Sequence, residues 1–233
     1  MINKKNEKTP FIERKHGYLV LKFENLIDGI VISRINRFLV KCLVNDNEIY
    51  AHLHDPGRLN EIIYPGNTIK LRPVENGKYR YAVTFGYDGF NYTLNDARFH
   101  SMIASKFLRP GYRKEYKYMD SRIDFLLDNY LIEVKSCTLV ESKMAMFPDA
   151  VTLRGKHHLE LLSKSINDGY KPYIMFLIFN QRAECFVPNF NRDPKFSETF
   201  YKAIDSGVVP RFLVFYINNG SVYFDKEIKL CNI

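Results

Sequence analysis

The first half of the chain alternates short apolar runs with turn residues. Within each run hydrophobic side chains fall at about every second position, the period of a strand with one buried face. Turn-forming pairs such as Pro65-Gly66 and Asn76-Gly77 separate the runs. Short strands at regular spacing predict a small β-barrel or sandwich, and an oligonucleotide-binding (OB) barrel fits that pattern. The expected strands are residues 18–23, 29–34, 38–44, 48–53, 68–74 and 79–87.

Near residue 94 the apolar spacing becomes helical, and a helix over 94–107 is expected with Asn95 or Asp96 as its N-cap. Strands and helices then alternate, which predicts an α/β or α+β domain. We therefore expect an OB-like β-domain over residues 1–94, with 1–17 as a charged arm, and a second domain over 95–233. The second domain's expected strands are 115–119, 122–127, 130–136, 172–179 and 212–217, and its helices are 150–166, capped by Asp149 and stopped by Gly169, and 197–206.

Charge narrows the range of partners. The 34 Lys and Arg against 26 Asp and Glu give a formal net charge of +8. A basic balance favours a polyanionic partner, because Lys and Arg release counterions from phosphate backbones, although a basic soluble protein without such a partner has the same composition.

The N-terminus and the cysteines indicate the expected cellular location. The polar N-terminus predicts neither a signal peptide nor a membrane anchor, and no apolar run is long enough to span a bilayer. The four cysteines form no C-x-x-C pair, which argues against a cysteine zinc site. We expect a cytoplasmic protein with reduced thiols and no membrane partner.

The chemistry concentrates in residues 121–162. Side chains alternate along a strand, so Glu133 and Lys135 share one face. Asp128-Asn129 is a credible two-residue hairpin turn, because both residue types tolerate positive φ angles. That turn pairs Leu127 with Tyr130 and puts Asp124 directly opposite Glu133.

Two carboxylates at that spacing form a cradle of hard oxygen ligands, and Mg²⁺ or Mn²⁺ is the expected cofactor, held by Asp124 and Glu133. The Lys135 ammonium can orient an attacking water or stabilise charge on a phosphoryl group. The plainer alternative is that these are solvated side chains on a strand. The strongly apolar surroundings of Glu133 in the sequence favour the site.

Three further residues are candidates for the same site. Arg154 and His158 lie four positions apart on the expected helix and so share a face, from which they could contact phosphate or water. A surface arginine and a satisfied core histidine are the alternative. Glu115 could be a third carboxylate, or one exposed residue of an alternating edge strand.

In the first half, His52 and His54 alternate onto one strand face, but without a clear third ligand we interpret them as surface or polar-core residues. The Asp55-Pro56-Gly57-Arg58 stretch predicts a turn. Tyr79 and Tyr81 lie on a basic β-surface that suits single-stranded or backbone-led binding. The candidate nucleic-acid contacts over the whole chain are Arg37, Arg58, Arg72, Arg80, Arg122 and Arg154.

Nearly the whole chain after about Arg34 resembles the sugar fermentation stimulation protein A (SfsA) family. The matching stretches include Ser121-Arg122-Ile123-Asp124-Phe125, Ile132-Glu133-Val134-Lys135-Ser136, residues 147–152 (FPDAVT) and Arg154-Gly155 with His158. The FPDAVT and RGxxH blocks are more specific than the D…ExK spacing. One departure is Asp55-Pro56-Gly57, where many members have Asn-Thr-Gly.

The resemblance implies an OB-type domain followed by a PD-(D/E)XK nuclease-like domain, with Asp124, Glu133 and Lys135 as motif residues and Glu115, Arg154 and His158 in support. It also implies DNA binding linked to regulation of sugar (maltose) metabolism. Two main hypotheses follow: a metal-dependent nuclease, and a DNA-binding regulator that needs no catalysis. A hydrolase of another phosphate compound or a pure interaction module is the third. The expected partner is DNA, bound mainly through its backbone with low sequence specificity, and a symmetric homodimer is the expected oligomer.

Overall fold

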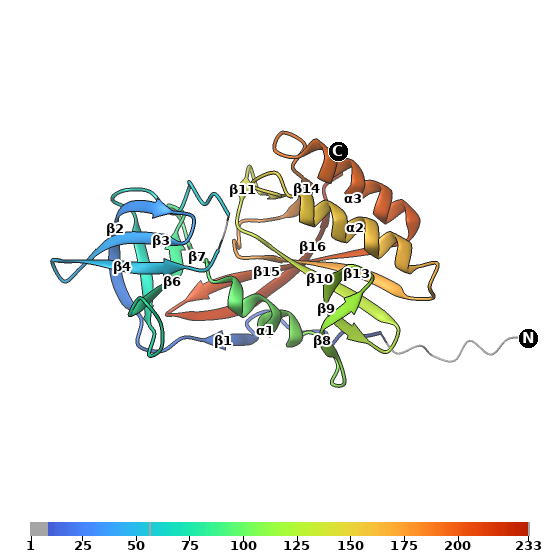
Figure 1. The fold of residues 1–233 in the computed structure, drawn as a ribbon, viewed down its shortest axis with the longest axis horizontal. Coiled ribbons are helices and arrows are strands. Elements are labelled where there is room, and N and C mark those ends of the chain that lie inside the picture. Colours follow the sequence, from blue (N-terminus) through green and yellow to red (C-terminus); the bar gives the residue numbers. More distant parts are fainter. Residues whose placement is uncertain (1–8, 56, 233) are drawn as a thin grey trace, which may run out of the picture.

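The computed structural model describes residues 9–55 and 57–232, which form a barrel on one side and a larger α/β domain on the other (Figure 1). The barrel strands follow the order β4-β3-β2-β5-β6-β7, and a parallel pairing of β4 with β6 closes it. The predicted OB-like barrel is confirmed. Its strands are β2 (Ile27–Asn36), β3 (Leu39–Val44), β4 (Asn47–Leu53), β5 (Thr68–Pro73), β6 (Tyr81–Tyr87) and the short β7 (Tyr92–Leu94), which the sequence pattern missed.

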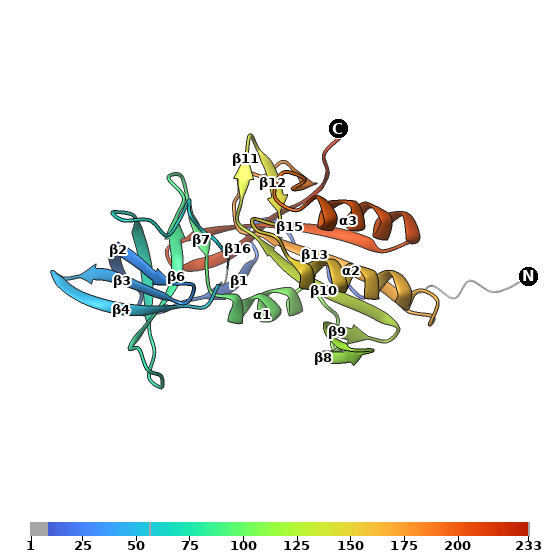
Figure 2. The same cartoon turned by 45° about the horizontal axis from the view of Figure 1, so that its top comes forward.

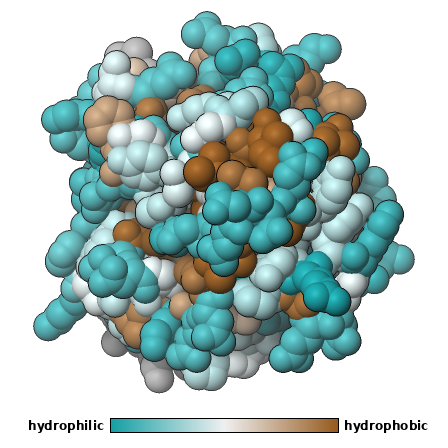
Figure 3. All heavy atoms as spheres, turned by 90° about the vertical axis from the view of Figure 1, so that its left-hand side faces the viewer, coloured by the Kyte–Doolittle hydropathy of each residue, from teal (hydrophilic) through white to brown (hydrophobic). Residues whose placement is uncertain are grey.

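Alternation along the strands fills the barrel. On β4, Ala51 and Leu53 are fully buried, whereas Tyr50, which precedes Ala51, is 46% exposed. Side chains on one face therefore make the barrel core and those on the other form its surface. Figure 3, which faces the barrel, shows apolar patches set among hydrophilic surface; exposed apolar residues of this domain include Ile30, Ile35 and Phe38.

The N-terminal segment belongs to the second domain, which corrects the expected boundary. Strand β1 (Leu19–Lys22) pairs with β16 (Ser221–Leu230) and not with the barrel. Phe11 is buried and bridges to Leu108. Residues 9–17 are thus tied to the second domain at Phe11, Ile12 and Gly17 and do not form a free arm. Residues 1–8 of that expectation lie outside the described residues. The pairing partner lies some 200 positions away in sequence, so local pattern could not reveal it.

The connection between the domains is shorter than the expected helix. A 3₁₀ turn, η1 (Ala97–Phe99), leads into the one-and-a-half-turn helix α1 (His100–Ser105). The side chain of Asp96 accepts a hydrogen bond from the Arg98 N–H, as an N-cap does. The predicted cap is confirmed, while Leu94 at the expected start of the helix belongs to β7.

The second domain is built on one mixed sheet with helices on both faces. Figure 2 shows α2 and α3 on one side of the sheet and α1 on the other. Its strand order is β11-β12-β14-β16-β15-β13-β10-β9-β8, with β10, β13 and β15 parallel to one another in the middle. Its elements are β8 (Arg113–Tyr118), β9 (Ser121–Leu127), β10 (Tyr130–Cys137), β11 (Val140–Glu141), β12 (Met144–Phe147), α2 (Leu153–Ser165), β13 (Lys171–Ile178), β14 (Cys185–Pro188), α3 (Pro194–Ser206), β15 (Val209–Asn218) and β16.

Burial on both faces explains why the central strands are apolar at consecutive positions. Leu131 of β10 packs with Leu159 of α2 in one core, and Ile132 packs with Ile103 of α1 in the other. The predicted α/β class and the five strands expected here are confirmed. The pattern missed β11, β12, β14 and β16, which lie at the other end of the sheet.

A disulfide joins Cys185 in β14 to Cys231 near the C-terminus, with their Cα atoms 4.9 Å apart. The expectation that all thiols are reduced is therefore wrong for this pair, whereas Cys42 and Cys137 are free and buried. Within the described part of the chain, no helix is both long and apolar enough to cross a membrane.

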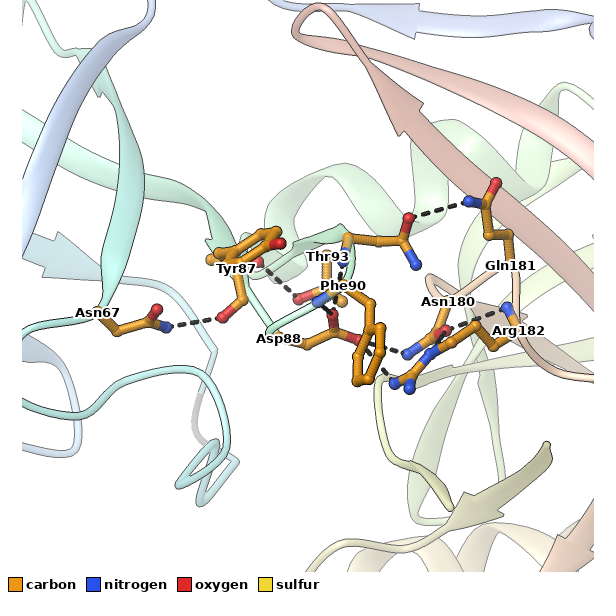
Figure 4. Close-up of polar contacts among 10 residues, drawn as sticks. Asn67, Tyr87, Asp88, Phe90, Thr93, Asn180, Gln181 and Arg182 are labelled. Carbon is orange, nitrogen blue, oxygen red and sulfur yellow. Dashed lines mark hydrogen bonds and ion pairs between the residues drawn. The ribbon is translucent and has the colours of Figure 1, made fainter. Parts of the chain in front are cut away.

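The domains meet through a polar joint between the β6–β7 turn and the loop after β13 (Figure 4). The Asp88 carboxylate accepts hydrogen bonds from Asn180 at 2.7 Å and from Arg182 at 3.2 Å. The Arg182 guanidinium also lies 4.1 Å from the centre of the Phe90 ring. The joint fixes the barrel against the sheet that carries the candidate chemistry.

Candidate active site

The hairpin that carries the motif has the predicted register. Leu127 pairs with Tyr130 and Phe125 with Ile132 around the Asp128-Asn129 turn. The ladder then ends one position before the predicted pair of Asp124 and Glu133. In place of that pair, a carboxylate oxygen of Asp124 accepts a hydrogen bond of 2.7 Å from the Val134 N–H.

The irregularity extends to the neighbouring strand. Glu115 on β8 has φ +49° and is skipped in the pairing, which joins Lys114 to Phe125 and then Tyr116 to Ile123. The Ile123 side chain packs on the α2 side and Phe125 on the α1 side, so strand alternation, which would place both on one face, is interrupted between them. The pairing of β9 is thus interrupted at Asp124, whose carboxylate bonds to β10.

Glu133 is held from two directions. It is 2% exposed, and its Oε1 lies 2.5 Å from the Lys135 ammonium and also accepts from Nδ1 of His158 on α2. The other oxygen, Oε2, is buried and has no hydrogen-bond partner. A buried carboxylate oxygen without a partner costs free energy, so Oε2 is an acceptor that a ligand could satisfy.

The two carboxylates have different proton affinities. Burial, reinforced by the charge of Glu133, raises the pKa of Asp124 to about 7. Burial also opposes ionisation of Glu133, but Lys135 and His158 outweigh it and hold the pKa of Glu133 below its usual value. The negative charge of Glu115 contributes to the raised pKa of Asp124, which places that residue within electrostatic range of the site.

His158 is a core residue that supports the site through its hydrogen bond to Glu133. It is 2% exposed, too buried to contact a phosphate, so that part of the sequence interpretation is wrong. Arg154 is exposed and donates from Nε to His158 Nε2 at 3.4 Å. Nε2 is therefore an acceptor, and Nδ1 carries the proton donated to Glu133.

The N-terminus of α2 differs from the prediction. Thr152 caps it by accepting from the Gly155 N–H at 3.0 Å, so the expectation that Asp149 is the cap is wrong. Asp149 instead accepts a hydrogen bond from the Arg58 N–H of the barrel at 3.1 Å. This contact between the domains joins residues 91 positions apart, and only the three-dimensional fold reveals it.

The site residues fit a hard divalent cation. Asp124 and Glu133 supply carboxylate oxygens, and the unpartnered Oε2 is an acceptor that a cation would satisfy. In the part of the chain that the structure describes, no group of three or more His, Cys, Asp or Glu side chains is arranged to hold an ion. Its remaining ligands would come from water or substrate oxygens, as is usual for Mg²⁺.

The candidate nucleic-acid contacts divide into two groups. Arg72 is partly buried, pairs with Asp96 at 3.3 Å and lies over the Phe99 ring, so it stabilises the connection between the domains. Its role as a contact for nucleic acid stays a prediction. The exposed members are Arg37, Arg58, Arg80, Arg122 and Arg154.

Two protein-family models match the chain and divide it as the fold does. One is described as the SfsA N-terminal OB domain and matches residues 32–92. The other is described as the sugar fermentation stimulation protein RE domain and matches residues 94–220.

The chain belongs to the sugar fermentation stimulation protein family. A sugar fermentation stimulation protein homolog of Picrophilus torridus is 74% identical over 223 residues, which cover 96% of this chain and 99% of the relative. The homolog of Saccharolobus solfataricus is 43% identical over 93% of this chain and 91% of its own length. The family resemblance given by the FPDAVT and RGxxH blocks is thus confirmed.

A solved structure of the same family has the same fold. It is described as Pyrococcus furiosus SfsA in complex with Ca²⁺, has a TM-score of 0.85 and is 26% identical, covering 91% of this chain and 99% of that one. The predicted architecture of this family, an OB domain followed by an α/β domain, is confirmed.

Proposed function

We propose that this protein is a Mg²⁺- or Mn²⁺-dependent nuclease that hydrolyses phosphodiester bonds in DNA. The observation that carries the proposal is the buried, unpartnered Oε2 of Glu133, a carboxylate whose charge also helps to raise the pKa of Asp124. Glu133 does not serve stability, because an unpartnered buried carboxylate oxygen is costly. Replacing such a buried polar group and its partners by apolar groups is often neutral or stabilising.

Asp124 and Glu133 would hold the cation, which supplies a Lewis acid for the scissile phosphate. The protein's own groups do the rest of the positioning. Lys135 pairs with Glu133 and has 14% of its side chain exposed, so it is less buried than that carboxylate. Its ammonium can orient the attacking water or stabilise the charge that develops on the phosphoryl oxygens. Exposed Arg154 is placed to bind a neighbouring phosphate.

The relative from Pyrococcus furiosus supports a hard-cation site, because its structure is described as a complex with Ca²⁺. Ca²⁺, Mg²⁺ and Mn²⁺ all prefer oxygen ligands of the kind that Asp124 and Glu133 offer. Mg²⁺ suits the present pair best for catalysis, since it commonly binds one or two carboxylates together with substrate phosphates.

The net charge of +8 supports nucleic acid as the substrate. Binding led by the phosphate backbone should weaken steeply with salt, in proportion to the number of phosphates contacted. The exposed arginines of both domains are the proposed contacts.

The test is incubation of the purified protein with supercoiled plasmid and with single-stranded DNA, plus Mg²⁺ or Mn²⁺. Cleavage should be lost in EDTA and in Asp124→Asn, Glu133→Gln and Lys135→Ala. Glu198→Gln, which neutralises an exposed carboxylate on α3, is the matched control and should cleave like the wild type. Calorimetry measures Mn²⁺ binding, which, among these variants, should be lost only in Asp124→Asn and Glu133→Gln.

Intact DNA that is nevertheless retarded on a gel would refute the nuclease and leave a DNA-binding regulator. Cleavage that persists in Glu133→Gln would show that the activity comes from another site or a contaminant.

A further inference from the structure

The barrel carries three ring side chains and three cations on one outer surface, here called the stacking face: Phe38, His52, Tyr79, Arg37, Lys78 and Arg80. Phe38 lies between β2 and β3, His52 on β4, and Tyr79 between β5 and β6. In five-stranded OB barrels the second and third strands, with the loops between strands one and two and between four and five, are where oligonucleotides bind. Counting from β2, the stacking face occupies those elements.

The rings form a continuous row. The centroids of Phe38 and His52 are 6.4 Å apart, and so are those of His52 and Tyr79, whose rings are inclined by only 28°. Phe38 is 47% exposed, so about half of this apolar ring contributes nothing to the free energy of folding through burial. The Phe38 ring is inclined by 54° to that of His52, so the three neighbouring rings offer aromatic surface at more than one angle to a ligand with flat groups.

The row is held in place by its own hydrogen bonds. The Phe38 N–H donates to the Asn36 side chain at 2.8 Å, and the Phe38 carbonyl accepts from the Leu53 N–H at 2.9 Å. His52 Nδ1 lies 2.9 Å from His54 Nε2, and burial lowers the pKa of His54 to about 4. His54 is thus neutral, and the hydrogen bond between the two rings fixes the orientation of the His52 ring. Such preorganisation reduces the entropy lost on binding.

Positive charge accompanies the rings at both ends. Arg37 adjoins Phe38, and Lys78 and Arg80 flank Tyr79; all three are exposed. The Lys78 ammonium lies 5.4 Å from the centre of the Tyr79 ring. Rings interleaved with cations match a chain that alternates flat bases with phosphates, whereas a protein partner would need no such alternation.

We propose that the stacking face binds single-stranded nucleic acid by stacking unpaired bases on Phe38, His52 and Tyr79. In a duplex the bases stack on one another, so only an unpaired strand can offer them to these rings. This inference rests on the proposed function in taking nucleic acid as the substrate, and it adds that the substrate or product presents an unpaired segment to the barrel.

The test is fluorescence anisotropy with a labelled single strand of about 16 nucleotides, the upper site size for one OB fold, and with the duplex of the same sequence. EDTA is present throughout, so that cleavage plays no part. The single strand should bind more tightly than the duplex. Phe38→Ala and Tyr79→Ala should each weaken single-strand binding by about five- to a hundredfold, the range for loss of one stacked base. Tyr79→Phe, which keeps the ring, should bind like the wild type.

Tyr64→Ala is the matched control, because Tyr64 is an exposed aromatic of the same domain, at 43%, outside the stacking face. A strand carrying 5-iodouracil, irradiated in the complex, should cross-link to a peptide containing Phe38, His52 or Tyr79. Equal losses in Tyr64→Ala, tighter binding of the duplex, cross-links elsewhere or no binding of either DNA would each overturn the proposal.

The two proposals fail separately. If the face is wrong and the nuclease right, Phe38→Ala and Tyr79→Ala will cleave single-stranded DNA as the wild type does while Asp124→Asn will not. If the nuclease is wrong and the face right, no variant will cleave and the ring variants alone will lose single-strand binding.

Discussion

His158 donates a hydrogen bond from its Nδ1 to Oε1 of Glu133, and it does so from a helix that begins twenty residues after Glu133. Removing this donor in His158→Ala should weaken Mn²⁺ binding by about 10- to 100-fold, the usual effect of losing a residue that orients a metal ligand. His158→Asn can place an amide N–H near the position of Nδ1 and should recover part of the loss. Calorimetric titration with Mn²⁺ measures both, and unchanged affinity in His158→Ala would show that Glu133 needs no such support.

The joint between the domains makes a second prediction. Asp88 has 6% of its side chain exposed and accepts from Arg182, which is 34% exposed. Asp88→Ala should lower the free energy of unfolding by about 3 kcal/mol, the low end for a broken buried pair because Arg182 keeps some water. Urea denaturation measures the change, with Glu75→Ala on the barrel surface as control. A loss no larger than the control's would mean that the apolar contacts alone hold the domains together.

Asp55 makes stability depend on pH. It is 8% exposed, and burial raises its pKa from 3.8 to about 6 despite the hydrogen bond it accepts from the Gly57 N–H. A group with a raised folded-state pKa contributes stability below its unfolded pKa and loses that contribution as the pH rises through the folded value. Between about pH 4 and pH 6 the wild type should therefore lose about 3 kcal/mol relative to Asp55→Asn, whose amide oxygen can still accept from Gly57.

Chemical denaturation of both proteins at several pH values gives this difference, which removes the contributions of His54 and His100 because both proteins share them. Asp149→Asn should move the transition to lower pH, since the charge of Asp149 raises the pKa of Asp55. Parallel profiles for wild type and Asp55→Asn would contradict the assignment.

The disulfide should contribute substantially to stability. Cys185 and Cys231 are 46 positions apart, a loop whose closure in the unfolded chain corresponds to about 4 kcal/mol in the chain-entropy treatment. Cys231→Ser should melt at a lower temperature than the oxidised wild type, and a thiol reductant should bring the wild type down to the level of the variant. If the reductant changes neither protein, the bond is absent in solution.

The sequence by itself determined the features that depend on neighbours along the chain. The register of the Asp124–Glu133 hairpin followed from turn chemistry and strand alternation, which act over a few residues. The Asp96 cap and most strands of both domains followed for the same reason. The D…ExK residues became candidates because charges interrupt an apolar strand.

Only the tertiary structure decided which distant groups meet. In the structure His158 is buried and supports Glu133, where the sequence had made it a candidate for contact with phosphate or water. Asp149 contacts the barrel and does not cap the helix, and β1 pairs with β16. The tertiary structure also interrupted the strand pairing at Asp124 and brought Phe38, His52 and Tyr79 close together. Such contacts depend on how sheets and helices pack, and packing selects partners by shape and burial whatever their separation in sequence.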